Sequence, residues 1–249
     1  MSKFEIRTFT DDTLLDGQVK IRQPNKGFRT TIDAVLLAAS VPASTGEKIL
    51  ELGLGSGGAS LCLCHRVAGS KITGIDINPE MVALAKENIK QNGFEERVEA
   101  RVGNVATRLP KCFVASFHQV MLNPPYLSRN TDHVSPNLDR AIATREGKAD
   151  LKRWLKYAHD SLLYKGRMSV IHRADRLNEL IRILPPNMGG VSIFPLWPRE
   201  GTEAKRVIVQ ARKGVKSPSR ILTGLTLHNE GGDYTDETKI VLKGGQIII

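Results

Sequence analysis

The sequence predicts an α/β protein built on a doubly wound, mostly parallel sheet of seven strands, with a hairpin and a helix added at the N-terminus. Two observations predict this class. From Lys48 onward, short apolar runs alternate with helical segments, which is the pattern of βαβ units. The first run leads directly into a glycine-rich loop at residues 53–58. We therefore expect right-handed crossovers between the parallel strands.

The N-terminal extension begins with a predicted hairpin. Residues 14–21 contain the pair Asp16-Gly17, the signal for a tight turn between two strands. A second turn is expected at residues 24–27, and the apolar run 34–39 predicts a helix. Three polar residues before or within its first turn can supply its N-terminal cap, namely Thr30, Thr31 and Asp33.

The predicted core alternates strands and helices. Strands are expected at residues 48–52, 71–77, 98–102, 118–122, 168–172, 191–197 and 206–211. Helices are expected at residues 59–67, 79–92, 151–164 and 177–184. The last two strands are joined by a polar loop, so we expect them to run antiparallel.

Two segments lie outside this alternation. The polar stretch 128–150 is expected to be a loop over the site or a connection without a role. The tail 217–249 contains a short amphipathic piece at 235–242 and is expected to be a small appendage or a partly ordered end. The predicted division is therefore an extension at 1–45, a core at 46–216 and an appendage at 217–249.

The composition favours a protein that meets polyanions. The chain has 249 residues and a formal net charge of +10, which predicts attraction to RNA, although a generically basic protein has the same composition. No apolar stretch approaches the roughly 20 residues needed to span a bilayer, and the first residues lack the apolar segment of a signal peptide. We therefore expect no membrane association and a cytoplasmic location.

The three cysteines do not indicate a disulfide framework or a metal site. Cys62, Cys64 and Cys112 form an odd set, and the spacing of Cys62 and Cys64 is wrong for a zinc knuckle. We expect these two thiols to be buried on a helix, and we expect no bound metal.

The glycine loop and an acidic residue downstream indicate a nucleoside-containing cofactor. Gly53, Gly55 and Gly58 satisfy the spacing GxGxxG, and Asp76 lies 25 residues after Glu51, at the end of the second predicted strand. A carboxylate there suits two ribose hydroxyls in nicotinamide enzymes and methyl-donor enzymes alike. Glu51 precedes the first glycine, and a carboxylate there suits an amine-bearing ligand better than a pyrophosphate. The pattern therefore favours S-adenosylmethionine over NAD.

The tetrapeptide Asn123-Pro124-Pro125-Tyr126 follows a buried strand, where open α/β sheets bind ligands. An Asn amide, proline carbonyls without competing N–H groups and an aromatic face can together hold a planar group that bears –NH2. A plain turn explains the same residues, because Asn and Pro are common in turns. The glycine loop upstream favours the interpretation as a site.

With these motifs in place, the chain resembles the class I S-adenosylmethionine-dependent methyltransferases, which have a Rossmann-like fold. Within them it is similar to the bacterial tRNA adenine-N6 methyltransferases that modify the adenine beside the anticodon of a valine tRNA. The resemblance covers roughly residues 10–245. It rests on residues 23–38, 51–57, 76–78, 123–126 and 204–207.

The resemblance implies a cofactor site. Glu51, Gly53 and Gly55 would border the methionine part of S-adenosyl-L-methionine, Asp76 would bind the ribose hydroxyls, and Ile77 would lie against the adenine. Asn104 stands where the family usually has Asp, and its amide oxygen can still accept a hydrogen bond from the adenine amino group. Residues near the cofactor in the family's pre-core segment are Thr30, Thr31 and Asp33.

The resemblance also implies transfer of a methyl group to N6 of an adenine in RNA, with tRNA near the anticodon as the substrate. Asn123 and Pro124 would accept the two amine hydrogens, and Tyr126 would stack on the base. Basic residues expected to contact RNA are Arg145, Lys205 and Arg206, although a solvated surface explains their charge equally.

The alternatives left open are N5-glutamine methylation of a protein, DNA adenine methylation, and a catalytically silent fold that binds RNA. The oligomeric state, monomer or homodimer, does not follow from the sequence.

Overall fold

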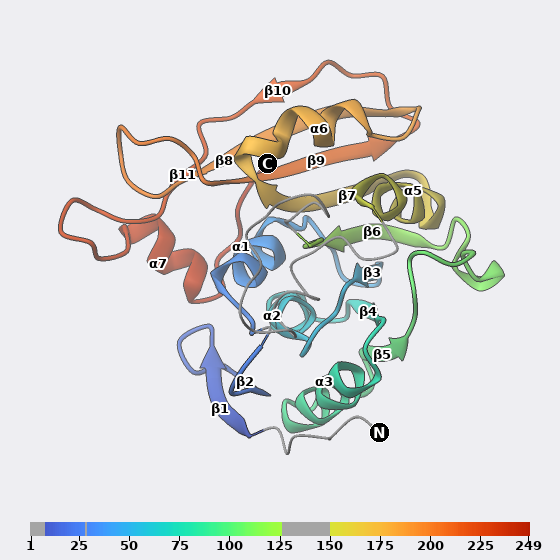
Figure 1. Ribbon diagram of the computed structural model, residues 1–249, viewed down its shortest axis with the longest axis vertical. Helices are drawn as coiled ribbons and strands as arrows, with labels where there is room; N and C mark the ends of the chain where they lie inside the picture. The colour runs from blue at the N-terminus through green and yellow to red at the C-terminus, as the bar shows by residue number, and fades with distance from the viewer. Residues whose placement is uncertain (1–7, 28, 126–149) are drawn as a thin grey trace.

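The computed structural model describes residues 8–27, 29–125 and 150–249. In that part of the chain, a central sheet has the strand order β10-β8-β9-β7-β6-β3-β4-β5, and β11 pairs with β8 as a ninth strand (Figure 1). The strands are β3 (Lys48–Leu52), β4 (Lys71–Asp76), β5 (Val98–Val102), β6 (Phe117–Leu122), β7 (Leu162–Arg173), β8 (Met188–Trp197), β9 (Arg206–Lys213), β10 (Arg220–Ile221) and β11 (Leu225–Thr226).

Helices cover both faces of this sheet. One face carries α1 (Ile32–Ser40), α2 (Gly58–Arg66), α3 (Pro79–Gln91) and α7 (Asp236–Leu242), and the other carries α5 (Leu151–Ser161) and α6 (Leu177–Arg182). Short 3-10 helices precede β6 at Lys111–Phe113 and α6 at Ala174–Arg176. The doubly wound α/β class is therefore confirmed.

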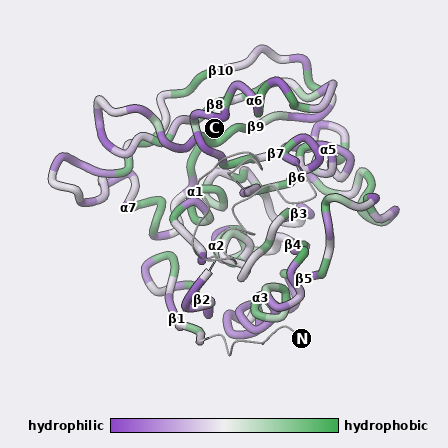
Figure 2. The backbone as a smooth tube through the Cα atoms, viewed as in Figure 1, coloured by the Kyte–Doolittle hydropathy of each residue, from purple (hydrophilic) through white to green (hydrophobic). Residues whose placement is uncertain are grey.

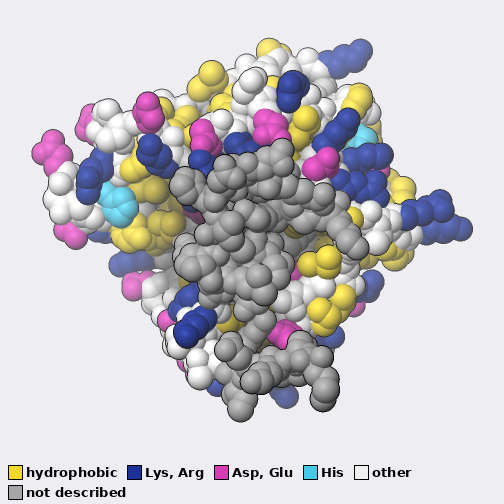
Figure 3. Space-filling model, viewed as in Figure 1, with side chains coloured by type: hydrophobic (Ala, Val, Ile, Leu, Met, Phe, Trp, Pro, Cys, Tyr) yellow, Lys and Arg dark blue, Asp and Glu magenta, His cyan; other side chains and the backbone are white. Residues whose placement is uncertain are grey.

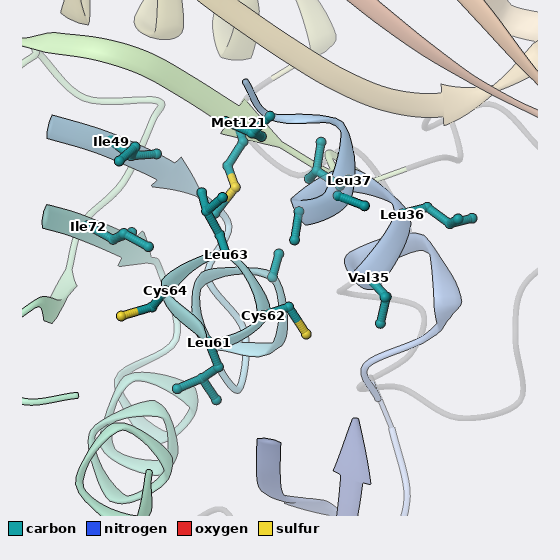
Figure 4. Packing of buried hydrophobic residues seen from close by; sticks show 14 of the residues in the cluster. Val35, Leu36, Leu37, Ile49, Leu61, Cys62, Leu63, Cys64, Ile72 and Met121 are labelled. Carbon is teal, nitrogen blue, oxygen red and sulfur yellow. The ribbon is translucent and has the colours of Figure 1, made fainter. Parts of the chain in front are cut away.

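The two faces form two separate hydrophobic cores because side chains alternate along each strand. On β3, Ile49 lies in the core beneath α1 and α2, whereas Leu50 and Leu52 lie in the core beneath α5. Figure 4 shows Leu63 of α2 placed between that helix and Met121 of β6. Each face is thus sealed by its own helices, which leaves the ends of the strands as the places for polar chemistry.

The thiols of Cys62 and Cys64 lie buried on α2, as predicted. Figure 4 shows Cys62 on the side of that helix toward α1 and Cys64 pointing away from it. Burial raises the pKa of both thiols, to about 11 for Cys64, so neither is a reactive thiolate at neutral pH.

The strand directions place five carboxyl ends side by side. Strands β3 to β7 pair in parallel, and β9 runs antiparallel between β7 and β8, as predicted for the last two strands of the core. The carboxyl edge therefore presents the residues that follow β7, β6, β3, β4 and β5 in that order. The amino edge presents the starts of these strands and the end of β9.

The sheet has two more strands than predicted, because the tail is part of it. Strands β10 and β11 each add two residues to the outer side of β8. Further on, the backbone N–H of Ile247 donates to the carbonyl of Ala39 in α1 at 2.9 Å. The segment 217–249 is therefore attached to both the sheet and a helix, and its treatment as a separate appendage stays a prediction.

One predicted helix was too long. The helix expected at 151–164 ends at Ser161, and Leu162 already pairs with Phe117 on β6. The next paired residues are Gln119 and Arg167, so β7 has extra residues between the two pairs and bulges there. The apolar residues Leu162 and Leu163 fit a helix pattern as well as a strand pattern, and only the pairing with β6 decides between them.

The N-terminal hairpin consists of β1 (Phe9–Leu14) and β2 (Val19–Pro24), as predicted. It forms its own two-stranded sheet and lies against α3 rather than joining the central sheet. In Figure 2 the hydrophobic colour follows the central strands, and the hydrophilic colour follows outer loops such as the one before α7. Within the described residues, none of the helices has both the length and the apolar character needed to cross a bilayer.

Candidate active site at the carboxyl edge

The glycine loop connects β3 to α2 at the carboxyl edge. Gly53, Gly55 and Gly57 have φ angles of 77°, 55° and 94°, a conformation that side chains with a Cβ strongly disfavour. The backbone N–H groups of Gly53 and Leu54 both donate to the carbonyl of Ile75 in β4, at 2.9 and 3.0 Å. The loop is thereby held against the end of β4.

Glu51 is buried beneath this loop, 4% exposed. Its carboxylate oxygen accepts hydrogen bonds from the backbone N–H of Ser60 at 3.0 Å and from the Ser60 hydroxyl. Burial raises the pKa of Glu51 to about 8; the Ser60 bonds oppose this shift, and the negative charge of Asp76 adds to it. A cation brought to this carboxylate would favour its charged form, so the site is suited to an amine-bearing ligand.

Asp76 ends β4 next to the loop. One carboxylate oxygen accepts the backbone N–H of Gly55 at 2.8 Å, and the other accepts the backbone N–H of Asn78 at 2.9 Å. Burial raises its pKa, and the backbone hydrogen bonds oppose that shift. The side chain is thus held in one orientation, and each oxygen keeps a lone pair for a hydroxyl donor.

Two exposed apolar side chains stand beside Asp76. Ile77 follows Asp76 directly and is 62% exposed, and Val102, the β5 residue that pairs with Asp76, is 59% exposed. Large apolar side chains that stay exposed at the end of a sheet and flank polar groups indicate a surface for a ligand. Together with Asp76 they suit a ligand that has hydroxyls next to a flat apolar ring.

Asn104 lies in the turn after β5. Its side-chain oxygen accepts the backbone N–H of Ala106 at 2.8 Å, and its own carbonyl accepts the backbone N–H and the hydroxyl of Thr107 at 3.0 and 2.7 Å. The amide oxygen that the sequence analysis assigned to a cofactor contact therefore already holds its own turn. It retains a second lone pair for a ligand.

Thr30, rather than Thr31, touches the glycine loop. The Thr30 hydroxyl lies 3.0 Å from the hydroxyl of Ser56, and a Cβ on Gly58 would come within 2.5 Å of the Thr30 methyl group. Thr31 is exposed at the N-cap of α1 and makes no side-chain capping bond. Its assignment to the cofactor site stays a prediction.

The sequence analysis missed Asn88, which ties the glycine loop to the N-terminal hairpin. This buried amide on α3 donates to the carbonyls of Ser56 and Arg22 at 2.9 and 2.8 Å, and accepts the backbone N–H of Arg22 at 2.7 Å. One turn later, Asn92 donates to the carbonyl of Lys20 at 2.7 Å and accepts its N–H at 2.9 Å. An Asn pair at i and i+4 on an otherwise amphipathic helix was the available signal.

Asn123, Pro124 and Pro125 follow β6 at the centre of the carboxyl edge. The last residue of β6, Leu122, pairs with Leu52 on one side and with Val170 of β7 on the other. Asn123 therefore emerges next to the start of the glycine loop, and its role in binding the target amine stays a prediction. Tyr126, the fourth residue of the motif, lies outside the described residues.

Helix α5 supports the same edge with two side chains that sequence reasoning did not place there. The Trp154 ring lies so close to Gly53 that a Cβ on this glycine would approach it to 3.0 Å. Arg153 donates to the carbonyls of Val105 and Thr107 at 3.0 and 2.6 Å. The helix thus packs against both the glycine loop and the loop after β5.

The two described basic residues assigned to RNA differ in their surroundings. Lys205 is exposed, and its ammonium lies 3.8 Å from the Glu203 carboxylate. Arg206 is held by the Asp33 carboxylate of α1 at 3.0 Å, so it joins β9 to α1. Arg145 lies outside the part of the chain that the structure describes.

Comparisons with known proteins agree with this geometry. Residues 43–186 match the family model described as a methyltransferase domain. A tRNA1(Val) (adenine(37)-N6)-methyltransferase from Flavobacteriaceae bacterium strain 3519-10 is 29% identical over 171 residues, which cover 69% of this chain and 66% of that protein. A protein of the same name from Aeromonas salmonicida is 24% identical over 88% of this chain and 90% of its own length.

A solved structure has the same fold. The crystal structure of a predicted O-methyltransferase from Agrobacterium tumefaciens superimposes with a TM-score of 0.74 and 24% identity, over 87% of this chain and 99% of that chain. At this identity the likeness speaks for the fold alone. The family model covers more than half of the chain.

Proposed function

The chain belongs to the methyltransferase-domain family of class I S-adenosylmethionine-dependent enzymes, and we propose that it methylates N6 of an adenine in RNA, with a tRNA as the substrate and a base near the anticodon as the target. The observation that carries the proposal is the position of Asn123. It follows β6 immediately beside the glycine loop of β3. A planar amine held by Asn123 would therefore lie next to the cofactor residues.

The cofactor residues fit the donor by their chemistry. Glu51 supplies a carboxylate for the amino group of the methionine part, together with Gly53 and Gly55 of the loop. Asp76 supplies oriented oxygens for the ribose, and Ile77 supplies an apolar surface for the adenine. When bound, S-adenosylmethionine supplies a methyl group attached to a positively charged sulfur. The neutral thioether that remains is the leaving group.

The protein's part in the reaction is to hold and orient the target amine. An exocyclic amine on adenine is a weak nucleophile, because its lone pair is delocalised into the ring. The Asn123 side-chain oxygen and the Pro124 carbonyl accept the two amine hydrogens, which builds electron density on the nitrogen and directs its lone pair toward the methyl donor. Positioning of this kind carries most of the rate in transfers between two held reactants.

The relatives named for tRNA and the charge of the chain support RNA as the substrate. A paired base cannot reach such a site, so the target has to be flipped out or unpaired in a loop. Lys205 is an exposed basic residue at this edge that can meet a phosphate. Arg206 is held by Asp33 at the start of β9, and its contact with RNA stays a prediction.

The test is a substrate panel. The protein is incubated with radiolabelled methyl donor and, in separate reactions, with total tRNA, ribosomal RNA, DNA and peptide release factors. We expect label in tRNA alone, recovered as N6-methyladenosine after nuclease digestion. Lys205→Glu should raise the KM for tRNA and make it less sensitive to salt, with kcat little changed.

Label on protein glutamine, with none on adenine, would replace this proposal with glutamine methylation. Absence of label from every substrate, with donor binding intact, would indicate a catalytically silent member of the family.

A further inference from the structure

The amino edge of the sheet, opposite the candidate active site, contains a polar cavity of about 300 Å³. Its wall is the bulge of β7 between Leu162 and Arg167, where Lys165 takes a φ of 63°. The described residues that line it come from the loop before β3, from β6, from the bulge and from β9. The charged and polar side chains among them are Glu47, His118, Gln119, Lys165, Arg167 and Arg212.

The charges around the cavity are unbalanced. Arg167 on β7 and Arg212 on β9 are directly opposite one another in the antiparallel pair, an arrangement that is unfavourable for like charges. Arg220 is close enough to add to their repulsion, and burial together with these two neighbours lowers the pKa of Arg167. Figure 3 shows Lys and Arg side chains gathered in the upper right, beside α5 and the end of β9.

Only one carboxylate lines the cavity among the described residues, and it is already engaged. One oxygen of Glu47 accepts the backbone N–H of Ser44 at 3.0 Å and the amide of Gln119 at 3.1 Å. The Arg167 guanidinium donates to Gln210, a neutral partner, at 3.0 Å, and Arg212 donates to the carbonyl of Lys165 at 3.4 Å. Among the described residues, neither arginine forms an ion pair with a carboxylate, and the charge of Glu47 offsets the repulsion of Arg167 by its neighbours only in part. The cavity therefore keeps a positive charge that an anion would neutralise.

The hydrogen-bonding groups define the ligand further. His118 accepts the backbone N–H of Lys48 at its Nδ1, which leaves the proton of the neutral ring on Nε2 as a donor. The Gln119 side-chain oxygen is buried away from solvent and has no hydrogen-bond partner, so it is not a contact for a ligand in the cavity. A ligand that fits the cavity has to carry anionic oxygens for the cations and for the His118 donor.

We propose that this cavity binds a phosphate group. Arg167 and Arg212 contact the anionic oxygens, and Lys165 closes the exposed side. Free inorganic phosphate and a backbone phosphate of RNA both carry such oxygens. Gln119 lies on β6, four residues before Asn123, which follows that strand, so the cavity lies about 13 Å along the strand direction from the candidate active site.

The first experiment uses inorganic phosphate and needs neither RNA nor methyl donor. The thermal unfolding midpoint of the full chain is measured with increasing phosphate and compared with sodium chloride of equal ionic strength. We expect a saturable rise of a few degrees beyond the chloride reference. A negative result in this experiment would exclude the phosphate site and would leave the proposed methyl transfer untouched.

Two variants make this test specific. Arg212→Gln should raise the midpoint in the absence of phosphate, because the repulsion with Arg167 is removed, and should abolish the gain from phosphate. Lys165→Gln, at an exposed position, should reduce that gain. The matched control is Arg182→Gln on α6, an exposed arginine outside the cavity, which should keep the full gain.

A second experiment separates the two sources of phosphate and rests on the proposed function. If the source is RNA, Arg212→Gln should weaken tRNA binding and lower the slope of log affinity against log salt by about one. If tRNA binding is unchanged while the phosphate gain is lost, the source is free phosphate. The site itself is excluded if wild type gains nothing beyond chloride, or if Arg212→Gln gains as much as wild type.

Discussion

The two edges of the central sheet have opposite electrostatic character. At the carboxyl edge, Glu51 and Asp76 lie beneath and beside the glycine loop, where they suit a cationic, hydroxyl-bearing ligand. At the amino edge, Arg167 and Arg212 face each other across adjacent strands and suit an anion. Both edges are built by the same strands, so the difference comes from which residues end a strand and which begin it.

The edges also differ in how they are held. Hydrogen bonds from Asn88 on α3 and Thr30 before α1 converge on Ser56 in the glycine loop, and Trp154 of α5 lies against Gly53. At the amino edge the described groups leave a cavity and a buried oxygen without a partner. The carboxyl edge is thus preorganised by the protein's own side chains, whereas the amino edge lacks part of its hydrogen bonding and charge balance.

The largest effect on this comparison is expected from removing Asn123, the centre of the carboxyl edge. Asn123→Ala removes an acceptor for the target amine, so turnover should fall at least about a hundredfold. The affinity for S-adenosylhomocysteine, the demethylated product of the donor, should stay within about threefold. Radiolabel transfer to tRNA and calorimetric titration measure the two quantities. Full turnover in this variant would refute the proposed role of the motif.

Asp76 should show the converse behaviour. Asp76→Ala removes the oriented oxygens for the ribose hydroxyls, so the affinity for S-adenosylhomocysteine should fall about ten- to a hundredfold. The matched control is Glu99→Ala on β5, whose carboxylate binds Arg101 at the surface. Equal affinities of wild type and Asp76→Ala would show that the ligand does not reach this strand end.

The raised pKa of Glu51 predicts a pH dependence at the carboxyl edge. The free protein holds this carboxyl protonated below about pH 8, and binding of an ammonium group favours the charged form. The affinity for S-adenosylhomocysteine should therefore rise about tenfold from pH 6 to pH 8, with release of a proton on binding. Calorimetry in two buffers of different ionisation enthalpy measures both effects. Glu51→Gln should bind weakly with a flat profile.

The same pKa has a consequence for folding. Between the ordinary pKa of glutamic acid and about 8, the folded state binds more protons at Glu51 than the unfolded state does. The contribution of Glu51 to the free energy of unfolding is therefore largest at low pH and declines as pH rises through this window. In Glu51→Gln, this pH-dependent contribution to the free energy of unfolding should be absent when denaturation is measured across the same pH window.

Removal of Asn88 tests how the glycine loop is held, and it should give the smallest change in cofactor affinity. Asn88→Ala leaves the carbonyl of Ser56 without its donor, so the free energy of unfolding should fall by about 2 kcal/mol and cofactor affinity by about threefold. Asn92→Ala loosens the same hairpin without touching the loop. It should lower stability while affinity stays at the wild-type value. Equal affinities of the two variants would exclude the coupling to Ser56.

Most of the fold was predictable from local patterns. The alternation of apolar runs located β3, β4, β5 and β6 to within a residue of their observed bounds, and the Asp16-Gly17 turn located the hairpin. One failure was the two short strands β10 and β11, which the sequence did not predict, and another occurred where one segment satisfies two patterns. Residues 162–164 suited a helix by composition, and pairing with β6 made them a strand.

The candidate site divides in the same way. The glycine loop, Asp76 and Asn123 were found because each lies beside the strand end that positions it, a relation that is local in the chain. Asn88 and the pair Arg167–Arg212 were not found, because each contact joins residues that are far apart in the sequence. Asn88 lies 32 residues from Ser56, and the two arginines lie on different strands that pair only in the folded protein.

By itself, the sequence determined the α/β class and predicted the candidate site at the carboxyl edge of the sheet, because both follow from short-range periodicity and turn chemistry. The tertiary structure alone decided the burial that raises the pKa of Glu51 and the pairing of Arg206 with Asp33. It also placed like charges together at the amino edge. Burial and charge proximity depend on segments that meet only after folding, so no local pattern contains them.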